Sequence, residues 1–298
     1  MHDEDAAGAR DGRRCGAGAG RGGEPGQAGR AGQARPEDEA APSLGWDDGT
    51  MVSRAVERFA SDAVLIVGGA RAILLQVADP TVAVGVARHS DFAHRPVERL
   101  RNTLTFAYAT VVGTADDVAS VTKHVNHVHV PVNKAEDAEL QLWVAATLYE
   151  TAALVHEVVY GSVTPDLEGE LLAAYAPLGT SLQMPASLWP TTRAQFDTYW
   201  HARVGRLDVT ADARRIAHDL FAPVTAPPWV RAALPLARLL TIDLLPVPVR
   251  EAYGFRFGPL KRAKARWAWR VIRVIARALP ARVKSWPARH LLAQLRRS

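Results

Sequence analysis

A helical spacing of apolar residues runs through most of the chain from Ser53 onward, and it restricts the possible folds more than any other feature. Ser53 has the side chain of an N-cap, and apolar residues follow it at three- and four-residue spacing. The two-residue alternation of a half-buried strand is almost absent. Only the run HVNHVHVPV at 124–132 contains a short alternating piece, and its periodicity is ambiguous. The chain is therefore expected to be all-α.

Proline and glycine divide this pattern into separate helices. Residues 70–78 and 81–88 are nearly all apolar, as in helices that are buried on most sides. Pro96 is expected to open a helix over 97–112, which Gly113 stops.

Further helices are expected over 116–127 and up to Gly161. Later helix starts are marked by Pro165, Thr192, Thr210 and Pro228. We expect one domain of roughly ten helices over residues 50–298.

Composition limits the class of protein. The chain has 298 residues, of which 48% are hydrophobic and 22% charged, which suits a globular domain with a sizeable core. Residues 1–48 are rich in Gly, Ala and Arg and lack apolar periodicity, so this tail is expected to be disordered. The single Cys15 excludes an intramolecular disulfide framework and a cysteine-rich zinc or iron–sulfur site.

The same composition suggests a location. No apolar run reaches the ~18–20 residues of a spanning helix, and no secretory signal is visible. A cytoplasmic protein is expected, with peripheral attachment at the inner face of the membrane as a further hypothesis.

Positive charge is concentrated in residues 261–298, because no acidic residue follows Glu251. A helical arrangement places four arginines on one face and apolar residues on the neighbouring face. The arginines are Arg266, Arg270, Arg273 and Arg277, and the apolar residues are Trp267, Val271, Val274, Ile275 and Ala278. Such a helix either lies at an anionic membrane surface or packs its apolar stripe on the domain. Nucleic acid is not an expected partner, since no recognised binding motif accompanies the charge.

Three histidines, His124, His127 and His129, lie close together in the sequence. They are satisfied core or surface histidines in one interpretation, and two of them join a distant carboxylate at a single metal ion in another. In a third interpretation one of them is the axial ligand of a haem iron, which needs only one protein imidazole.

Arg99 and Thr103 are four residues apart and share one face of the expected helix over 97–112. Arginine offers a rigid fork of donors to a propionate, a carboxylate or bound oxygen, and threonine adds a hydroxyl. The alternative is an Arg99 that pairs with Glu98 or Asp91 and a threonine bonded to its own helix.

The order of several motifs resembles one known family. These motifs are GG-x-R-x-I-L-L-Q, G-V-x-x-H-S-x-F, P-x-x-R-L-x-x-T, V-x-x-V-H-x-x-V and L-W-V-A-A-T-L. The chain looks like the haem-containing oxygenases that include the latex clearing proteins (rubber oxygenases) and the MpaB-type oxygenases. The resemblance runs from about Val52 to about Pro287.

This resemblance implies an all-α, globin-like fold that binds haem b, with dioxygen activated at the iron to cleave a double bond of an isoprenoid chain. His129 matches the axial ligand, with His127 as its rival, and Arg99 and Thr103 match residues near the distal face. Rubber-cleaving members carry Lys where this chain has Asn102. Relatives often show His-Pro where this chain has Asp79-Pro80.

The resulting hypothesis is a haem b-dependent oxygenase that acts on a hydrophobic, isoprenoid or lipid-like substrate. His129 would ligate the iron, and Arg99, Asn102 and Thr103 would form the polar catalytic surroundings. An anionic membrane surface is an expected partner through residues 261–298. The alternative is a non-enzymatic helical protein that binds lipid or a membrane surface and has kept the fold without the cofactor.

Overall fold

The computed structural model describes residues 52–89, 96–129, 137–223 and 225–297. All regular secondary structure in these ranges is helical, which confirms the all-α prediction. The tail over residues 1–48 lies outside the described residues.

The helices of the first half are α1 (Arg54–Ala60), η1 (Ala63–Gly68), α2 (Gly69–Val77), α3 (Pro80–His89), α4 (Pro96–Val112), α5 (Ala115–His129) and α6 (Ala138–Tyr160). Those of the second half are α7 (Pro165–Tyr175), α8 (Pro177–Thr180), η2 (Ala186–Leu188), α9 (Arg193–Val204), α10 (Ala211–Phe221), α11 (Pro228–Leu244), α12 (Val247–Ala252), α13 (Pro259–Ala278), α14 (Ala281–Lys284) and α15 (Trp286–Leu295).

Local sequence signals account for most of these boundaries. The Ser53 hydroxyl accepts the N–H of Val56 at 3.3 Å and caps α1, and Thr192 and Thr210 cap α9 and α10 in the same way. Gly161 ends α6 with a φ of 99°, a left-handed conformation that glycine adopts without strain. The helices are more numerous than the roughly ten expected, because short elements such as α8, α12 and α14 begin beside prolines.

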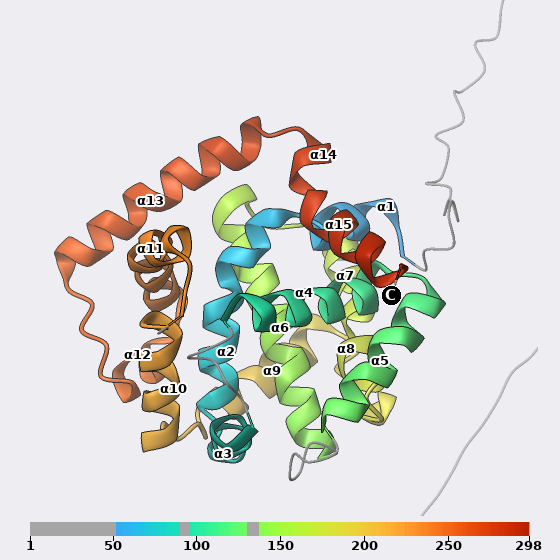
Figure 1. Ribbon diagram of the computed structural model, residues 1–298, viewed down its shortest axis with the longest axis horizontal. Helices are drawn as coiled ribbons and strands as arrows, with labels where there is room; N and C mark the ends of the chain where they lie inside the picture. The colour runs from blue at the N-terminus through green and yellow to red at the C-terminus, as the bar shows by residue number, and fades with distance from the viewer. Residues whose placement is uncertain (1–51, 90–95, 130–136, 224, 298) are drawn as a thin grey trace, which may run out of the picture. The chain divides into compact units, whose positions relative to one another are not determined.

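Helix α6 forms the centre of the fold. It packs against α2, η1, α8 and α13, and Figure 1 shows it behind α2 with the other helices around the two. Within the described residues, α6 is long and apolar enough to cross a membrane by length and composition, which corrects the expectation that no segment reaches this length. More than half of its apolar window is buried inside the fold.

Gly68 permits a close approach between the start of α2 and the middle of α6. Gly68 ends η1, and Gly69 begins α2 with no residue between the two elements. A Cβ on Gly68 would lie 2.4 Å from Thr151 Cγ2 and 2.9 Å from Val155 Cγ2, whereas a Cβ on Gly69 would meet nothing within 4 Å. Gly68 is therefore needed for the close packing of this segment on α6.

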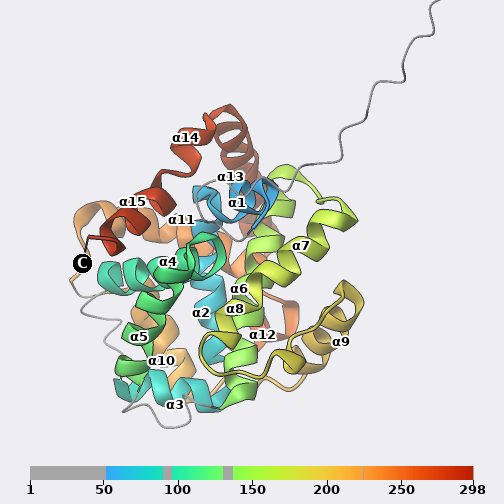
Figure 2. The ribbon, with the colours of Figure 1, turned by 90° about the vertical axis from the view of Figure 1, so that its right-hand side faces the viewer.

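Helix α15 packs across α4, as Figures 1 and 2 show. The Arg296 guanidinium donates to both oxygens of the buried Asp117 carboxylate, with Nε–Oδ1 at 3.0 Å and Nη2–Oδ2 at 2.8 Å. Asp117 also accepts the N–H of Thr114 at 2.9 Å and so caps α5. Burial alone would raise the pKa of Asp117, but the hydrogen bonds from Arg296 and Thr114 outweigh it and lower this pKa.

Helix α13 packs with a different face from the one expected. Its buried residues are Ala265, Ala268, Trp269 and Ala276, and the Trp269 indole donates to Asp243 at 3.0 Å. Trp267, Val274 and Ile275, which were assigned to the apolar stripe, are exposed. The interpretation in which that stripe packs on the domain is therefore wrong for these three residues.

Candidate active site

The first turns of α4 carry Arg99, Asn102 and Thr103 on neighbouring positions. Arg99 is half-buried, and burial lowers the pKa of its guanidinium, which nonetheless stays cationic near neutral pH. Asn102 and Thr103 are exposed among the described residues. These three positions fall at i, i+3 and i+4, so the guanidinium, amide and hydroxyl lie along one side of the helix.

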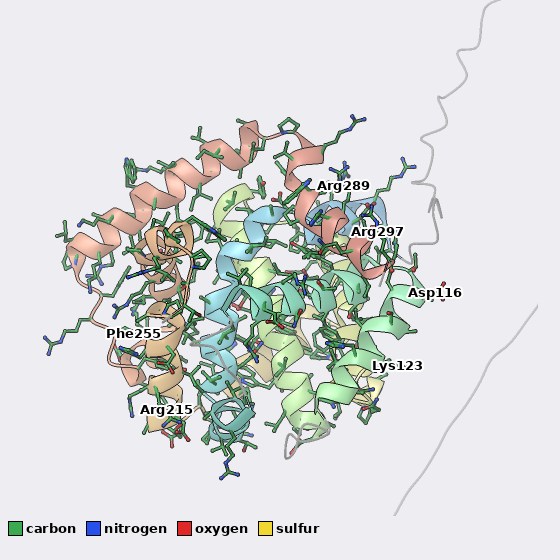
Figure 3. The ribbon with its side chains drawn as sticks, viewed as in Figure 1. Asp116, Lys123, Arg215, Phe255, Arg289 and Arg297 are labelled. Atoms are coloured by element: carbon green, nitrogen blue, oxygen red, sulfur yellow. The ribbon has the colours of Figure 1, made fainter. Side chains whose placement is uncertain are left out.

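The candidate histidines occupy the last turns of α5. His124 is exposed, as is the adjacent Lys123, which Figure 3 labels on α5. His127 and His129 are helical, and His129 is the last residue of α5. The side chains of these two lie outside the part of the chain that the structure describes.

Helices α4 and α5 form a hairpin whose far ends carry these candidates. Gly113 and Thr114 alone join the two helices, and the helices pack against each other. At 1.5 Å per residue, Arg99 lies about 20 Å along α4 from this link, and His129 lies about 20 Å along α5 from it. Both positions are therefore remote from the link by the same axial distance.

The sequence did not identify a buried charged contact among α2, α6 and α11. Arg71 of α2 is 1% exposed, and it pairs with Glu150 of α6. Its Nε donates to the Leu244 carbonyl at 2.8 Å, and its Nη1 donates to Thr151 Oγ1 at 2.6 Å. One arginine thus ties α2 to α6 and α11. The sequence signal that could have predicted this contact is the single charged residue, Arg71, in the apolar run 70–78. A charge buried in such a run requires a partner.

Asp79 has a structural role that explains its place before Pro80. Its Oδ1 accepts the N–H groups of Thr81 at 2.8 Å and Val82 at 3.1 Å, so it caps α3. Its Oδ2 pairs with Arg203 of α9 at 2.5 Å, and that guanidinium lies 5.6 Å from the ring centroid of Trp143. The aspartate found where relatives often show histidine therefore connects α3 to α9.

Two tryptophans, Trp143 of α6 and Trp200 of α9, are both buried. The rings of Trp143 and Trp200 stack at a centroid distance of 5.4 Å, and the Trp143 indole donates to the Leu75 carbonyl at 3.2 Å. This aromatic stack fills the space between α6 and α9 and gives rigidity to the end of α6 that follows the 130–136 segment.

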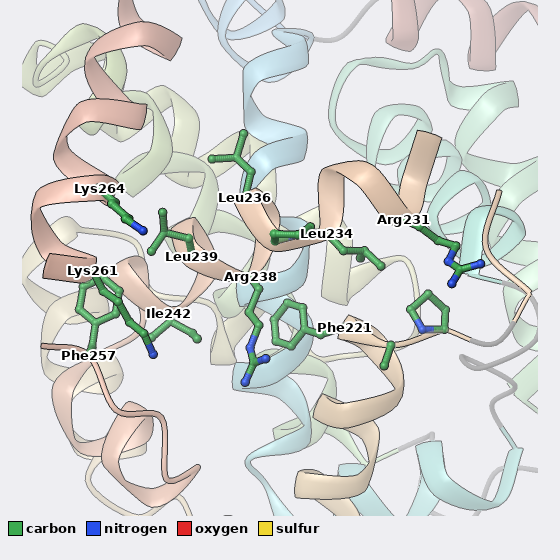
Figure 4. A pocket seen from close by; sticks show the side chains of 13 residues that line it. Phe221, Arg231, Leu234, Leu236, Arg238, Leu239, Ile242, Phe257, Lys261 and Lys264 are labelled. Atoms are coloured by element: carbon green, nitrogen blue, oxygen red, sulfur yellow. The ribbon is translucent and has the colours of Figure 1, made fainter. Parts of the chain in front are cut away.

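A groove of about 830 Å³ lies elsewhere, between α11 and α13 (Figure 4). Its apolar walls include Phe221, Leu239 and Ile242. Four basic side chains line it, namely Arg231, Arg238, Lys261 and Lys264, and no acidic residue does. None of its lining residues belongs to α4 or α5, so this groove is separate from the candidate residues of the helical hairpin.

The chemistry of the α4–α5 donor set fits a haem. A cationic, half-buried guanidinium suits a propionate, an amide and a hydroxyl suit polar ligands near an iron, and a helical histidine suits the axial position. By contrast, the described residues contain no group of three His, Cys, Asp or Glu side chains that could hold a metal ion by themselves.

The described residues thus form an all-helical domain that carries Arg99, Asn102 and Thr103 on α4 and the candidate histidines on α5. The family described as "ER-bound oxygenase mpaB/B'/Rubber oxygenase, catalytic domain" matches residues 57–281, and the chain belongs to this family. The resemblance deduced from the sequence motifs is thereby confirmed.

Two relatives are similar over much of their length. The uncharacterized proteins Mb2261 of Mycobacterium bovis and Rv2237 of Mycobacterium tuberculosis are each 28% identical to this chain over 225 residues. The alignment covers 70% of this chain and 88% of each relative. No solved structure matches the chain significantly.

Proposed function

We propose that this protein is a haem b-dependent oxygenase that acts on a hydrophobic, isoprenoid or lipid-like substrate. The observation that carries the proposal is the family match over residues 57–281, which spans the α4–α5 hairpin and its donor set. Bound haem would supply an iron at which dioxygen is activated. The protein supplies the ligand, the polar donors and the exclusion of water.

Each candidate residue has a distinct role in this proposal. The His129 imidazole would hold the iron, with His127 as the rival ligand two residues earlier. Arg99 would donate hydrogen bonds to a propionate or to a polar ligand, and its partial burial would strengthen this charged contact. The Thr103 hydroxyl orients a neighbouring polar group on the same side of α4.

Asn102 makes this position of the site neutral, whereas the rubber-cleaving members carry a charged lysine there. An amide can donate and accept hydrogen bonds, but it carries no positive charge and is a poor iron ligand. The position that an ammonium would occupy is therefore neutral in this chain. We expect the distal side to be more accessible to added small ligands than it would be with lysine at this position.

Absorption spectroscopy of the purified protein tests the proposal. The haem-loaded protein should show a Soret band, and His129→Ala should abolish it or greatly weaken it. His124→Ala is the matched control, because it removes an exposed imidazole from the same helix and should leave the band intact. Loss of the band in His127→Ala with retention in His129→Ala would transfer the ligand role to His127.

A colourless protein that takes up no added haemin would contradict the proposal. That outcome would favour the alternative function, in which the helical domain binds lipid or a membrane surface without a cofactor. Activity assays then separate the two further, since oxygen consumption with an apolar substrate is expected only of the oxygenase.

A further inference from the structure

The outward face of α13 presents large apolar side chains to solvent. Leu260, Trp267 and Val274 are 69%, 66% and 69% exposed. They are spaced by seven residues, which is close to two helical turns, so they form one stripe along the helix. The opposite face holds the buried Ala265, Ala268 and Trp269. The stripe therefore points away from the core that α13 covers.

Basic side chains lie within this apolar stripe. Lys264 follows Leu260 by four residues and precedes Trp267 by three, and Arg270 stands in the same relation to Trp267 and Val274. Residues at these spacings are neighbours on a helix surface. The side chains of Arg266 and Arg270 make no hydrogen bond or ion pair with any residue in the described ranges. Their charge is therefore available to an external partner.

Two other arginines of α13, Arg273 and Arg277, bind the end of α6. Arg273 donates to the Val158 carbonyl at 2.7 Å, and Arg277 donates to the Tyr160 carbonyl at 3.4 Å. These carbonyls belong to the last turn of α6, whose partial negative charge favours a cation. The two contacts hold α13 in one rotation about its axis, so the apolar stripe stays outward.

Exposed apolar residues continue beyond α13. Val283 of α14 and Trp286 at the start of α15 are 50% and 59% exposed. Figure 1 shows α13 arching over the outside of the molecule and leading into α14 and α15. A run of exposed aromatic and aliphatic side chains of this extent marks an interaction surface.

We propose that this outer face of α13 docks on an anionic lipid bilayer. Tryptophan and aliphatic side chains enter the boundary between headgroups and acyl chains, while Lys264 and Arg270 extend their charged ends to lipid phosphates. Lys264 also lines the groove with Arg231, Arg238 and Lys261, so positive charge continues from the stripe into the groove (Figure 4). No acidic residue follows Glu251 in the sequence to offset this charge.

A second copy of this chain is a poorer occupant of the same face. A two-fold contact would place Lys264 and Arg270 of both copies near one another, and like charges with no intervening carboxylate repel. Nucleic acid would satisfy the cations, but it offers no apolar layer for Leu260 and Val274. An anionic bilayer satisfies both the charge and the apolar stripe.

Co-sedimentation of the full chain with vesicles tests this proposal. Binding is expected to vesicles of phosphatidylcholine mixed with phosphatidylglycerol, and it should fall as salt rises from about 0.1 M to about 0.5 M. Vesicles of phosphatidylcholine alone should bind far less. The double variants Trp267→Ser/Val274→Ser and Lys264→Gln/Arg270→Gln should each weaken binding by about tenfold or more.

The matched control changes the same kinds of residue on another helix. Val84 and Arg88 are exposed on α3, four residues apart, and Val84→Ser/Arg88→Gln should change binding less than about twofold.

The conservative variant Trp267→Phe guards against an effect of misfolding. Bromine-labelled lipid should quench part of the tryptophan fluorescence of the wild type, and Trp267→Phe should lose that part.

Three outcomes would overturn the proposal. The first is no difference between anionic and neutral vesicles, and the second is an equal loss of binding in the α3 control. The third is a stable dimer or a nucleic acid complex that the Trp267→Ser/Val274→Ser variant disrupts while vesicles remain unbound. These assays need neither haem nor substrate, so failure of the docking proposal is distinguishable from failure of the proposed oxygenase.

Discussion

At the scale of single residues, Arg71 shows what a charged side chain can contribute inside an apolar fold. Its guanidinium lies among α2, α6 and α11 with partners on two of them, and its Cζ is 5.8 Å from the ring centroid of Trp200. A buried ion pair adds little net stability over an apolar pair, but removal of one partner leaves the other charge uncompensated. The pair therefore acts mainly to fix which helix surfaces meet.

We expect Arg71→Met to destabilise the protein by about 2–4 kcal/mol, because it leaves the largely buried Glu150 carboxylate without its counter-ion. The double variant Arg71→Met/Glu150→Leu should recover much of this loss. Urea unfolding followed by circular dichroism measures both values.

Arg215→Met provides the comparison for this prediction. Arg215 pairs with Asp212 on the exposed side of α10, and its loss should cost at most about 1 kcal/mol. Equal effects of Arg71→Met and Arg215→Met would show that the buried pair has no special role.

At this scale, the sequence predicted only those features of the candidate site that depend on neighbouring residues in the chain. Arg99 and Thr103 share a helix face because Pro96 and Gly113 bound α4, and these signals are readable from the sequence. Burial of Arg99 and exposure of Thr103 depend on which helices pack over α4. Such long-range packing has no counterpart in the local spacing of residues.

At the scale of helices, α13 shows why the apolar pattern alone left open whether its apolar stripe packs on the domain. Hydropathy gives most weight to large residues such as Trp267 and Val274, which face solvent. The buried face uses Ala265 and Ala268, whose small side chains let α13 approach α6 and α11 closely. Helix boundaries were predictable because caps act locally, whereas the choice of buried face depends on the partner helix.

The close contact between α2 and α6 gives a prediction from two adjacent glycines. Gly68→Ala should destabilise the protein by about 1–3 kcal/mol, since its Cβ would overlap Thr151 in a packed interior. Gly69→Ala should be neutral or stabilising by up to about 1 kcal/mol, because its Cβ meets no atom and alanine favours the helix. Thermal unfolding of the two variants measures the difference. A Gly68→Ala protein as stable as Gly69→Ala would show that α6 shifts easily.

At the scale of the whole molecule, two apolar clusters share α6. The larger one contains Leu74 and Trp143, and the smaller one joins the end of α6 to α11 and α13 through residues such as Val159 and Leu240. The larger cluster also includes Ala288, Leu291 and Leu292 of α15, and Arg296 adds a charged contact to Asp117 just past the end of this helix. The α15 helix and Arg296 lie beyond residues 57–281, which the family matches.

The Arg296–Asp117 contact predicts a pH-dependent stability. The pKa of Asp117 is lower in the folded protein than its unfolded value of about 3.9, so its contribution is complete above about pH 5 and is lost as pH falls through the folded pKa. Asp117→Asn should therefore melt at a lower temperature than the wild type at pH 7, and this difference in melting temperature should narrow as the pH falls below about 4. Asp116→Asn, at an exposed neighbouring position (Figure 3), should melt at nearly the same temperature as the wild type at every pH. A melting-temperature difference between Asp117→Asn and the wild type that does not change with pH would contradict the prediction.

The separation of Asp117 and Arg296 by 179 residues also has a consequence for synthesis. At the usual elongation rates of about 5–20 residues per second, the ribosome needs roughly ten to forty seconds to deliver the arginine after the aspartate. During that interval the α4–α5 hairpin has emerged without α15 to cover it. Nascent chains thus pass through a stage in which the apolar surface that α15 later covers is still open, and chaperone binding would act at that stage.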